Sequence, residues 1–356
     1  MIAFQASVSK GWLHDKGGFV FDEKYYKDPL YRQIQDRKMN GIVRKELPDY
    51  PIYNMEANLM QAGFTSENQV LVGGIQPNLI LAIVLGSEFV AYADKDSDVS
   101  GNPLQDIASA GELPGMDQVL EHPFIRDLDA RILELKNSHP ELEVIPPFFW
   151  DRSGRATIHG IITTSLKLIG DNAMIMLIMD PDLMHAVHQW ITDVYILLIG
   201  HFAELVNMPI TSVHVGECSG TMISDEQYAE FITPYVTQLG KAFGNVRLHS
   251  CGSTDHLLNA ISKIENLAVI DTGSNTSVAK IREMKGDDFE INLEPPISLM
   301  LKDSPKSEIL TWLEQVLEEN RGGPLKFAFH LESGYAIENC LAIYDELVKR
   351  NLIHKL

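Results

Sequence analysis

Short apolar runs alternate with longer segments of helical periodicity over most of the chain. The apolar runs are rich in Val, Ile and Leu and lie at residues 69–74, 211–215, 246–249, 267–271, 289–293 and 326–329. Segments with apolar residues at helical spacing lie between them, at 77–85, 181–206, 224–243, 255–264, 278–284, 306–319 and 337–350. This alternation is typical of βα units, in which helices cover a parallel sheet.

About eight such units follow residue 60, which favours a (β/α)8 TIM barrel over an open sheet. We therefore assign residues 61–356 to the barrel. Residues 1–60 are polar and mixed, with a helical segment at 31–46 ended by Pro48 and Pro51. They are predicted to form an N-terminal helical extension packed on the barrel. No GxGxxG or Walker sequence follows a predicted strand, which excludes the usual dinucleotide and nucleoside triphosphate sites.

Charge narrows the range of partners. The chain has 29 Lys and Arg against 49 Asp and Glu, a formal net charge of −20. Such a surface repels phosphate backbones, so we expect no nucleic-acid partner. It also disfavours a polyanionic substrate unless basic residues gather in one cleft.

Location is predicted from the N-terminus, the apolar runs and the cysteines. The first residues lack a basic start followed by an apolar stretch, so no secretory signal is predicted. No apolar run reaches the roughly 18 residues that a membrane span needs. Three cysteines in a chain of this length argue against a disulfide framework. We expect a cytoplasmic protein with no membrane partner.

Polar residues gather where the predicted strands end, the edge of a barrel at which active sites lie. Each set follows its own strand: Glu217 and Cys218, His249 and Cys251, Asp271, and His330 and Glu332. Loops that leave neighbouring parallel strands lie close together. We expect Glu217, Cys218, His249 and Cys251 to converge at this face. Trp150, Arg152 and Arg155 are further candidates for the mouth of the barrel, and the sequence does not decide their role.

The pair His249 and Cys251 has the spacing of two metal ligands. In an extended segment, residues i and i+2 point to the same side, so both side chains can reach one ion. An imidazole and a thiolate suit zinc, and His249 would then donate its other ring N–H to a neighbour. The structural alternative is a pair of small, partly buried cysteines beside a histidine bonded to the backbone.

Several stretches resemble the uroporphyrinogen decarboxylase superfamily. They are residues 160–170, 180–185, the S-x3-Y-x2-F-x2-P-Y sequence at 224–235, the strand and H-x-C-G sequence at 246–253, and Glu338–Asn339. The resemblance covers roughly residues 60–350 and implies a (β/α)8 barrel. In its decarboxylase branch, an N-terminal R-Q-A-G-R motif holds the carboxylates of the substrate and no metal is needed. The nearest string here, Tyr31–Arg37, departs from that motif.

The second branch holds corrinoid-dependent methyltransferases, which bind zinc through H-x-C and a later cysteine. His249 and Cys251 match the first two ligands. The third cysteine of the family should fall at about residues 330–334, where this chain has none. Cys218 and Glu217 are the preferred substitutes, followed by His330 and Glu332.

The resemblance therefore implies a zinc-dependent methyltransferase, with Glu217, His249 and Cys251 as catalytic residues. A methyl group would move between a corrinoid of the cobalamin type, held on a separate carrier protein, and a small thiol or methylated substrate. The sequence reveals neither the methyl donor nor the acceptor. Two alternatives stay open: a metal-independent decarboxylase of the uroporphyrinogen type, and a non-catalytic protein that binds a corrinoid or tetrapyrrole.

Overall fold

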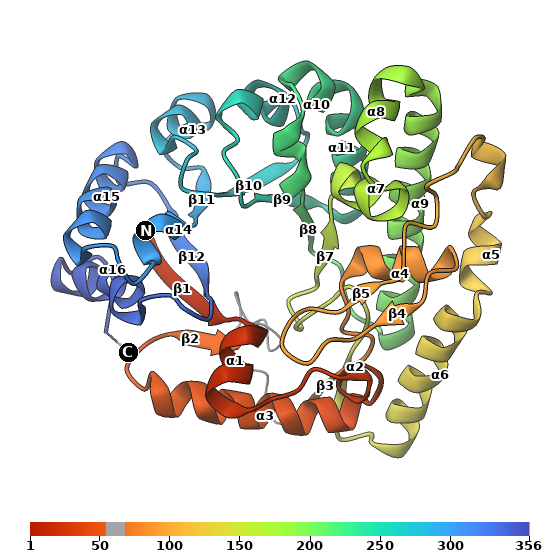
Figure 1. Cartoon of the computed structure of the whole chain (residues 1–356), viewed down its shortest axis with the longest axis horizontal. Helices are drawn as coiled ribbons and strands as arrows, with labels where there is room; N and C mark the ends of the chain where they lie inside the picture. Colours follow the sequence, from red (N-terminus) through yellow and green to blue (C-terminus); the bar gives the residue numbers. More distant parts are fainter. Residues whose placement is uncertain (55–67, 356) are drawn as a thin grey trace.

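A curved parallel sheet forms the centre of the molecule (Figure 1). The structure, a computed structural model, describes residues 1–54 and 68–355. The strands follow the order β2–β1–β12–β11–β10–β9–β8–β7, with every neighbouring pair parallel. Their bounds are β1 (Ile2–Val8), β2 (Ile52–Asn54), β7 (Arg155–His159), β8 (Ser212–Gly216), β9 (Asn245–Ser250), β10 (Leu267–Thr272), β11 (Glu290–Leu293) and β12 (Leu325–Leu331).

Two smaller sheets complete the strands that the structure describes. β3 (Gln69–Leu71) and β6 (Glu143–Ile145) pair in parallel, and β4 (Phe89–Val90) and β5 (Asp98–Val99) pair antiparallel. The main-chain N–H of Thr157 donates to the carbonyl of Phe148 at 2.8 Å, which joins the segment after β6 to β7. The result is an α/β fold with a curled parallel sheet, compatible with a TIM barrel.

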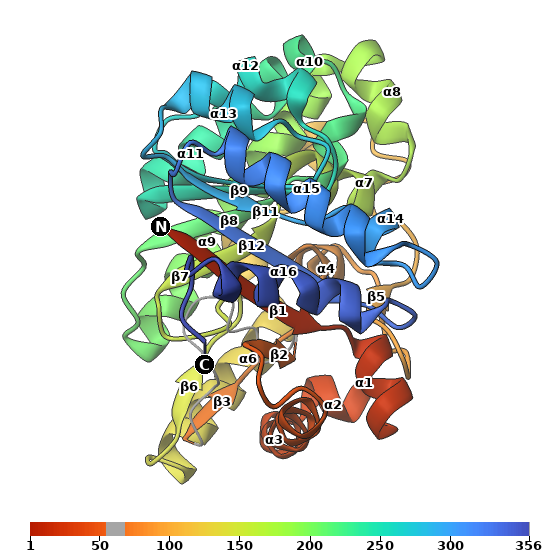
Figure 2. The ribbon, with the colours of Figure 1, turned by 90° about the vertical axis from the view of Figure 1, so that its left-hand side faces the viewer.

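Helices surround the curved sheet (Figures 1 and 2). They are α1 (Lys10–Gly17), α2 (Glu23–Lys27), α3 (Pro29–Glu46), α4 (Pro77–Val84), α5 (Met116–Leu120), α6 (Pro123–Ser138), α7 (Ile161–Ile169), α8 (Asn172–Met179), α9 (Pro181–Val206), α10 (Asp225–Phe231), α11 (Thr233–Phe243), α12 (Leu258–Ser262), α13 (Val278–Lys285), α14 (Ile297–Met300), α15 (Lys306–Glu319) and α16 (Ile337–Lys349), with 3-10 turns η1 (Ala110–Glu112), η2 (Cys218–Met222) and η3 (Asp255–Leu257). Figure 2 shows α1, α8 and α14 on the side toward which β1 runs, so these helices lie at the C-terminal face of the sheet.

The N-terminal part of the chain differs from the prediction. β1 lies inside the sheet, where residues 2–8 pair with residues 325–331 of β12. A stretch predicted to lie outside the barrel therefore supplies one strand of the central sheet, followed by helices α1 to α3. The predicted boundary between residues 60 and 61 lies outside the described residues.

Two further boundaries also differ. The apolar residues at 158–168 favour a helix that begins at Ile158, but β7 occupies Arg155–His159 and α7 starts only after Gly160. The predicted helix at 224–243 is two helices, broken at Ile232. Pro234, in the first turn of α11, explains the break, because a proline cannot donate the main-chain hydrogen bond that a continuous helix needs.

No single helix in the described part of the chain combines the length and apolar character needed to cross a membrane. Helices α7 and α8 meet that test only when taken together, and they are bent by 111° at the break between them.

The position of β1 predicts the cost of a core mutation there. Phe4 is 9% exposed, and its ring lies 5.6 Å from that of Phe329 and 5.4 Å from that of Tyr344. Phe4→Ala should lower the free energy of unfolding by about 3–5 kcal/mol, because it leaves a cavity between sheet and helix. Urea unfolding measures this cost, with the exposed Val20→Ala as control. A cost below about 1 kcal/mol would show that β1 is peripheral to the core.

Candidate metal centre

Three neighbouring strands deliver the side chains of the site to one edge of the sheet. In the registers of β8, β9 and β10, Gly216 lies opposite His249, and His249 lies opposite Asp271. Cys218 follows β8 at the start of η2, and Cys251 follows β9 directly. Adjacent parallel strands end at the same face, so residues far apart in the sequence meet there.

Cys218, His249 and Cys251 form a compact group of potential metal ligands. One ligand atom from each lies within 4.8 Å of the other two. The two sulfur atoms are 3.1 Å apart, and both cysteines are free thiols. Cys251 is exposed and the other two are half-buried, so the group is open to solvent on one side.

A buried carboxylate sets the orientation of His249. Oδ2 of Asp271 lies 3.3 Å from Nδ1 of His249 and also accepts from Nε of Arg247 at 3.1 Å. Nε2 of His249 is therefore the nitrogen left for the two cysteines. Asp271 therefore lies where a neighbour could accept the other ring N–H of His249, and a carboxylate in this position is common behind metal-bound histidines.

Charge in the group favours one thiolate beside a protonated imidazole. Burial lowers the pKa of His249, but Asp271 and the two cysteines outweigh it and raise that pKa well above its ordinary value. Hydrogen bonds from Cys218 and His249 lower the pKa of Cys251 to about 4. The contact with Cys251, together with burial, raises the pKa of Cys218. Cys251 therefore carries the negative charge of the pair.

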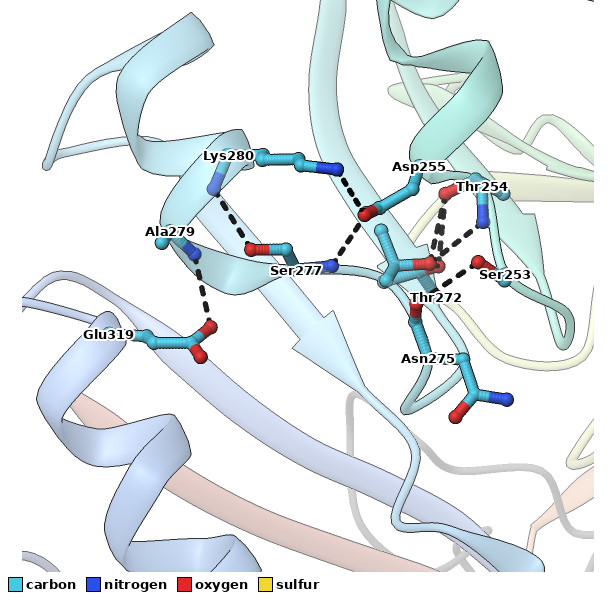
Figure 3. A network of polar contacts seen from close by, with 10 residues as sticks. Ser253, Thr254, Asp255, Thr272, Asn275, Ser277, Ala279, Lys280 and Glu319 are labelled. Atoms are coloured by element: carbon cyan, nitrogen blue, oxygen red, sulfur yellow. Dashed lines mark hydrogen bonds and ion pairs between the residues drawn. The ribbon is translucent and has the colours of Figure 1, made fainter.

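The loop that carries Cys251 is fixed by a network of hydroxyl groups (Figure 3). Thr254, Thr272 and Thr276 bond to one another through their hydroxyls at 2.7–3.2 Å, and Thr276 Oγ1 accepts from the main-chain N–H of Thr254 at 2.9 Å. Ser253 donates to the carbonyl of Asn275 at 3.0 Å. These bonds tie the end of β9 to the end of β10, so the Cys251 loop is held by the barrel.

Gly273 permits the close approach of these two loops. A Cβ atom at this position would lie 2.2 Å from the carbonyl oxygen of Cys251, a distance that real Cβ atoms do not show. The main-chain N–H of Gly273 also donates to the carbonyl of Ser250 at 3.0 Å. Any larger residue at position 273 must displace the backbone of Cys251.

Glu217 is placed elsewhere. Its carboxylate accepts from the main-chain N–H groups of Ile162 and Thr163 at 3.3 and 3.0 Å, and from the Thr163 hydroxyl at 3.0 Å. It therefore caps the N-terminus of α7, where a negative charge is favoured. Burial raises the pKa of Glu217 to about 7, and these hydrogen bonds act against that rise. The structure does not bring Glu217 into the group of ligands.

His330 and Glu332 also stay outside the group. His330 Nδ1 is hydrogen-bonded to the hydroxyl of Ser7, and burial lowers the pKa of His330 to about 4. Glu332 is exposed, and the adjacent Ser333 donates to Asp15. His330 lines the cavity that also contains His249, but neither His330 nor Glu332 belongs to the group of potential ligands, in which Cys218 supplies the second thiol.

A cavity of about 210 Å³ opens beside His249. Trp150 and Arg155 line it, as considered from the sequence, whereas Arg152 is exposed and pairs with Glu143. Glu294, at the end of β11, also lines the cavity, and burial raises its pKa to about 7. Sequence analysis missed Glu294, although it follows an apolar strand as Asp271 does.

The close contact at Gly273 predicts a specific defect. Gly273→Ala should lower the free energy of unfolding by on the order of 1–3 kcal/mol, because the added methyl group overlaps the carbonyl of Cys251. Gly200→Ala is the matched control, since a Cβ there meets nothing within 4 Å. That change in α9 should stabilise the protein by about 0.5–1 kcal/mol. Equal effects of the two changes in urea unfolding would contradict the account.

The rate at which Cys251 is alkylated measures how much of this thiol is ionised. In protein freed of metal by a chelator, iodoacetamide should alkylate Cys251 at a nearly constant rate from about pH 6 to 8, because its thiolate is lost only as the pH falls through about 4. The buried Cys340, whose pKa burial raises to about 12, should react only after unfolding. Peptide mass spectrometry separates the sites. A rate for Cys251 that rises about tenfold per pH unit would mean an ordinary thiol.

Comparisons with known proteins give the family and the fold of the chain. No curated protein matches the chain. Among solved structures, a methyltransferase from Methanosarcina mazei is similar at a TM-score of 0.61 and 15% identity, covering 98% of this chain and 94% of that one, which is a likeness of fold. The model of the uroporphyrinogen decarboxylase (URO-D) family matches residues 156–349, more than half of the chain. The chain therefore belongs to the uroporphyrinogen decarboxylase family.

Proposed function

We propose that this protein is a zinc-dependent methyltransferase. It acts in the cytoplasm and moves a methyl group between a corrinoid, carried on a separate protein, and a small thiol or methylated substrate. The observation that carries the proposal is the meeting of Cys218, His249 and Cys251 at the C-terminal face. Two thiols and an imidazole are a ligand set that a decarboxylase of this family does not need.

The three residues fit zinc in number, type and spacing. Zinc lies about 2.0–2.3 Å from nitrogen and sulfur ligands, so tetrahedral donors are within about 4 Å of one another. The group here spans 4.8 Å or less. Asp271 leaves one ring nitrogen of His249 available, and the lowered pKa of Cys251 supplies a thiolate. Three protein ligands leave a fourth position for a substrate.

When bound, zinc would lower the pKa of a thiol or polarise a methylated substrate. The residues of the chain do the rest. Cys218, His249 and Cys251 would hold the ion, and Asp271 keeps the His249 ring in place. The exposed side of Cys251 faces solvent, where a carrier protein can present its corrinoid.

Arg32, from the string nearest to the arginine motif of the decarboxylase branch, is not among the residues that line the cavity. This residue is 1% exposed and donates to the carbonyl of Gly74 at 2.7 Å. Its guanidinium also lies 3.6 Å from Asp36 and above the ring of Tyr25. These contacts give Arg32 a structural role, so the decarboxylase alternative gains no support from this residue.

The proposal predicts about one zinc per chain, measured by mass spectrometry of purified protein. Cys251→Ser should remove most of the zinc and abolish methyl transfer from methylcobalamin to small thiols, because a hydroxyl is a poor zinc ligand. The far-ultraviolet circular dichroism should not change, since the core of the barrel does not include this residue. Glu332→Gln is the control, as Glu332 is exposed and outside the group.

Three outcomes would contradict the proposal. Full zinc occupancy and activity in Cys251→Ser would separate the cysteine from the function. Decarboxylation of a porphyrinogen by wild-type protein that ignores chelators would favour the decarboxylase alternative. A spectral shift of added cobalamin without methyl transfer would favour the non-catalytic binding protein.

A further inference from the structure

Two buried polar atoms lie side by side in the wall of the cavity. Thr157 of β7 and His214 of β8 are partners in the sheet register, and both line the cavity. Thr157 Oγ1 and His214 Nδ1 are buried, and neither has a hydrogen-bond partner in the part of the chain that the structure describes. Buried polar groups are rarely left in this condition, because a donor or acceptor removed from water without a partner destabilises the folded protein.

Two guanidinium groups accompany these atoms. Arg155 lies two residues before Thr157 on the same side of β7, and Arg247 of β9 is the register partner of His214. Both line the cavity, with exposed fractions of only 6% and 5%. Arg247 pairs with Asp271. Burial and then the charge of Arg247 lower the pKa of Arg155 to about 10, while Asp151 and Asp271 act in the opposite direction.

The cavity is therefore polarised along the barrel axis. Arg155 is the first residue of β7, deep in the barrel, while Glu294 and Cys251 come after the ends of their strands. The rings of His214 and His249 are 5.6 Å apart, so the basic end adjoins the candidate metal centre. On a chain with a net charge of −20, this is a local gathering of basic residues in one cleft.

We propose that this end of the cavity binds the carboxylate of a small organic acid. The Thr157 hydroxyl and the His214 ring donate to the carboxylate oxygens, and the carboxylate charge offsets the two guanidiniums. This places the other end of the acid beside His249. A cavity of about 210 Å³ is smaller than the roughly 300 Å³ at which drug-sized sites begin, which limits the ligand to a small molecule.

The chemical group at the other end of the acid, beside His249, depends on the proposed function. With that function, the substrate is a thiol acid or the acid of a methylated heteroatom. Without it, the carboxylate site remains as a binding site. The two claims are therefore tested by different measurements: zinc content and methyl transfer for the function, and ligand affinity for the site.

The test compares two probes of nearly equal shape, 3-mercaptopropionate and its neutral amide, 3-mercaptopropanamide. Calorimetric titration of zinc-loaded wild-type protein should give a dissociation constant at least about tenfold lower for the acid, because hydrogen bonds to a charged group are the stronger ones. Both probes carry the same thiol, so zinc contributes equally to both. Propionate, which lacks the thiol, should compete with the acid.

Three variants locate the effect. Thr157→Val removes the hydroxyl at constant shape and should raise the dissociation constant of the acid about tenfold, with little change for the amide. Thr157→Ser keeps a hydroxyl and should bind the acid as wild type does. Thr311→Val, on the exposed face of α15, is the control and should change neither value. Zinc content should be equal in all of them.

Equal affinity of wild-type protein for acid and amide would overturn the proposal. So would an unchanged affinity of Thr157→Val for the acid, or an equal loss of affinity in Thr157→Ser. Each of these results can occur in a protein that holds zinc and transfers methyl groups, so the proposed function would survive. Conversely, if the purified protein contains no zinc and still binds the acid more tightly than the amide, the proposed function is wrong and the carboxylate site is supported.

Discussion

The carboxylate of Asp271 is the contact on which the site depends. It is 4% exposed, and on one side it pairs with the guanidinium of Arg247 while on the other it faces Nδ1 of His249. The Arg247 contact offsets the cost of burying this charge, which an unpaired carboxylate could not meet. Asp271 thereby fixes the orientation in which the His249 ring faces the cysteines, and it lies between the candidate metal centre and the basic end of the cavity.

The registers of the parallel sheet place the other residues of the site beside this contact. Because β8, β9 and β10 are neighbours, Cys218, Cys251 and Asp271 leave the sheet within one narrow sector. The second thiol comes from the loop after β8, whereas the family resemblance places it near the last strand. The end of β12 instead holds His330 against Ser7 and leaves Glu332 in solvent.

Part of this arrangement can be predicted from the sequence. α9 and α15 have the bounds that the pattern predicts, since a proline marks or precedes the start of each. The pairing of His249 with Cys251 follows from the two-residue period of a strand. The closeness of Cys218 to this pair follows because successive strands are neighbours in a parallel sheet. β1 was missed because the polar residues Gln5 and Ser7 interrupt its apolar side chains, and β7 because Arg155 and His159 face the interior of the barrel.

Other features depend on contacts that no local pattern records. Glu217 has the right chemistry for a ligand, but the free N–H groups of α7 lie closer to it and hold its carboxylate. The basic end of the cavity combines Arg155, His214 and Arg247 from three strands, and each alone is an ordinary residue in an acidic chain. These residues are close together and buried only because the strands that carry them are neighbours in the curled sheet, which no local sequence pattern records.

The zinc site is the central claim, and X-ray absorption at the zinc edge tests it most directly. For zinc-loaded wild-type protein, the account predicts two sulfur ligands at about 2.3 Å and at least one nitrogen or oxygen at about 2.0–2.1 Å. In Cys218→Ser, the count of sulfur ligands should fall to one. Two sulfur ligands in that variant, or a wild-type spectrum with nitrogen and oxygen alone, would contradict the assignment of Cys218, His249 and Cys251 as the metal centre.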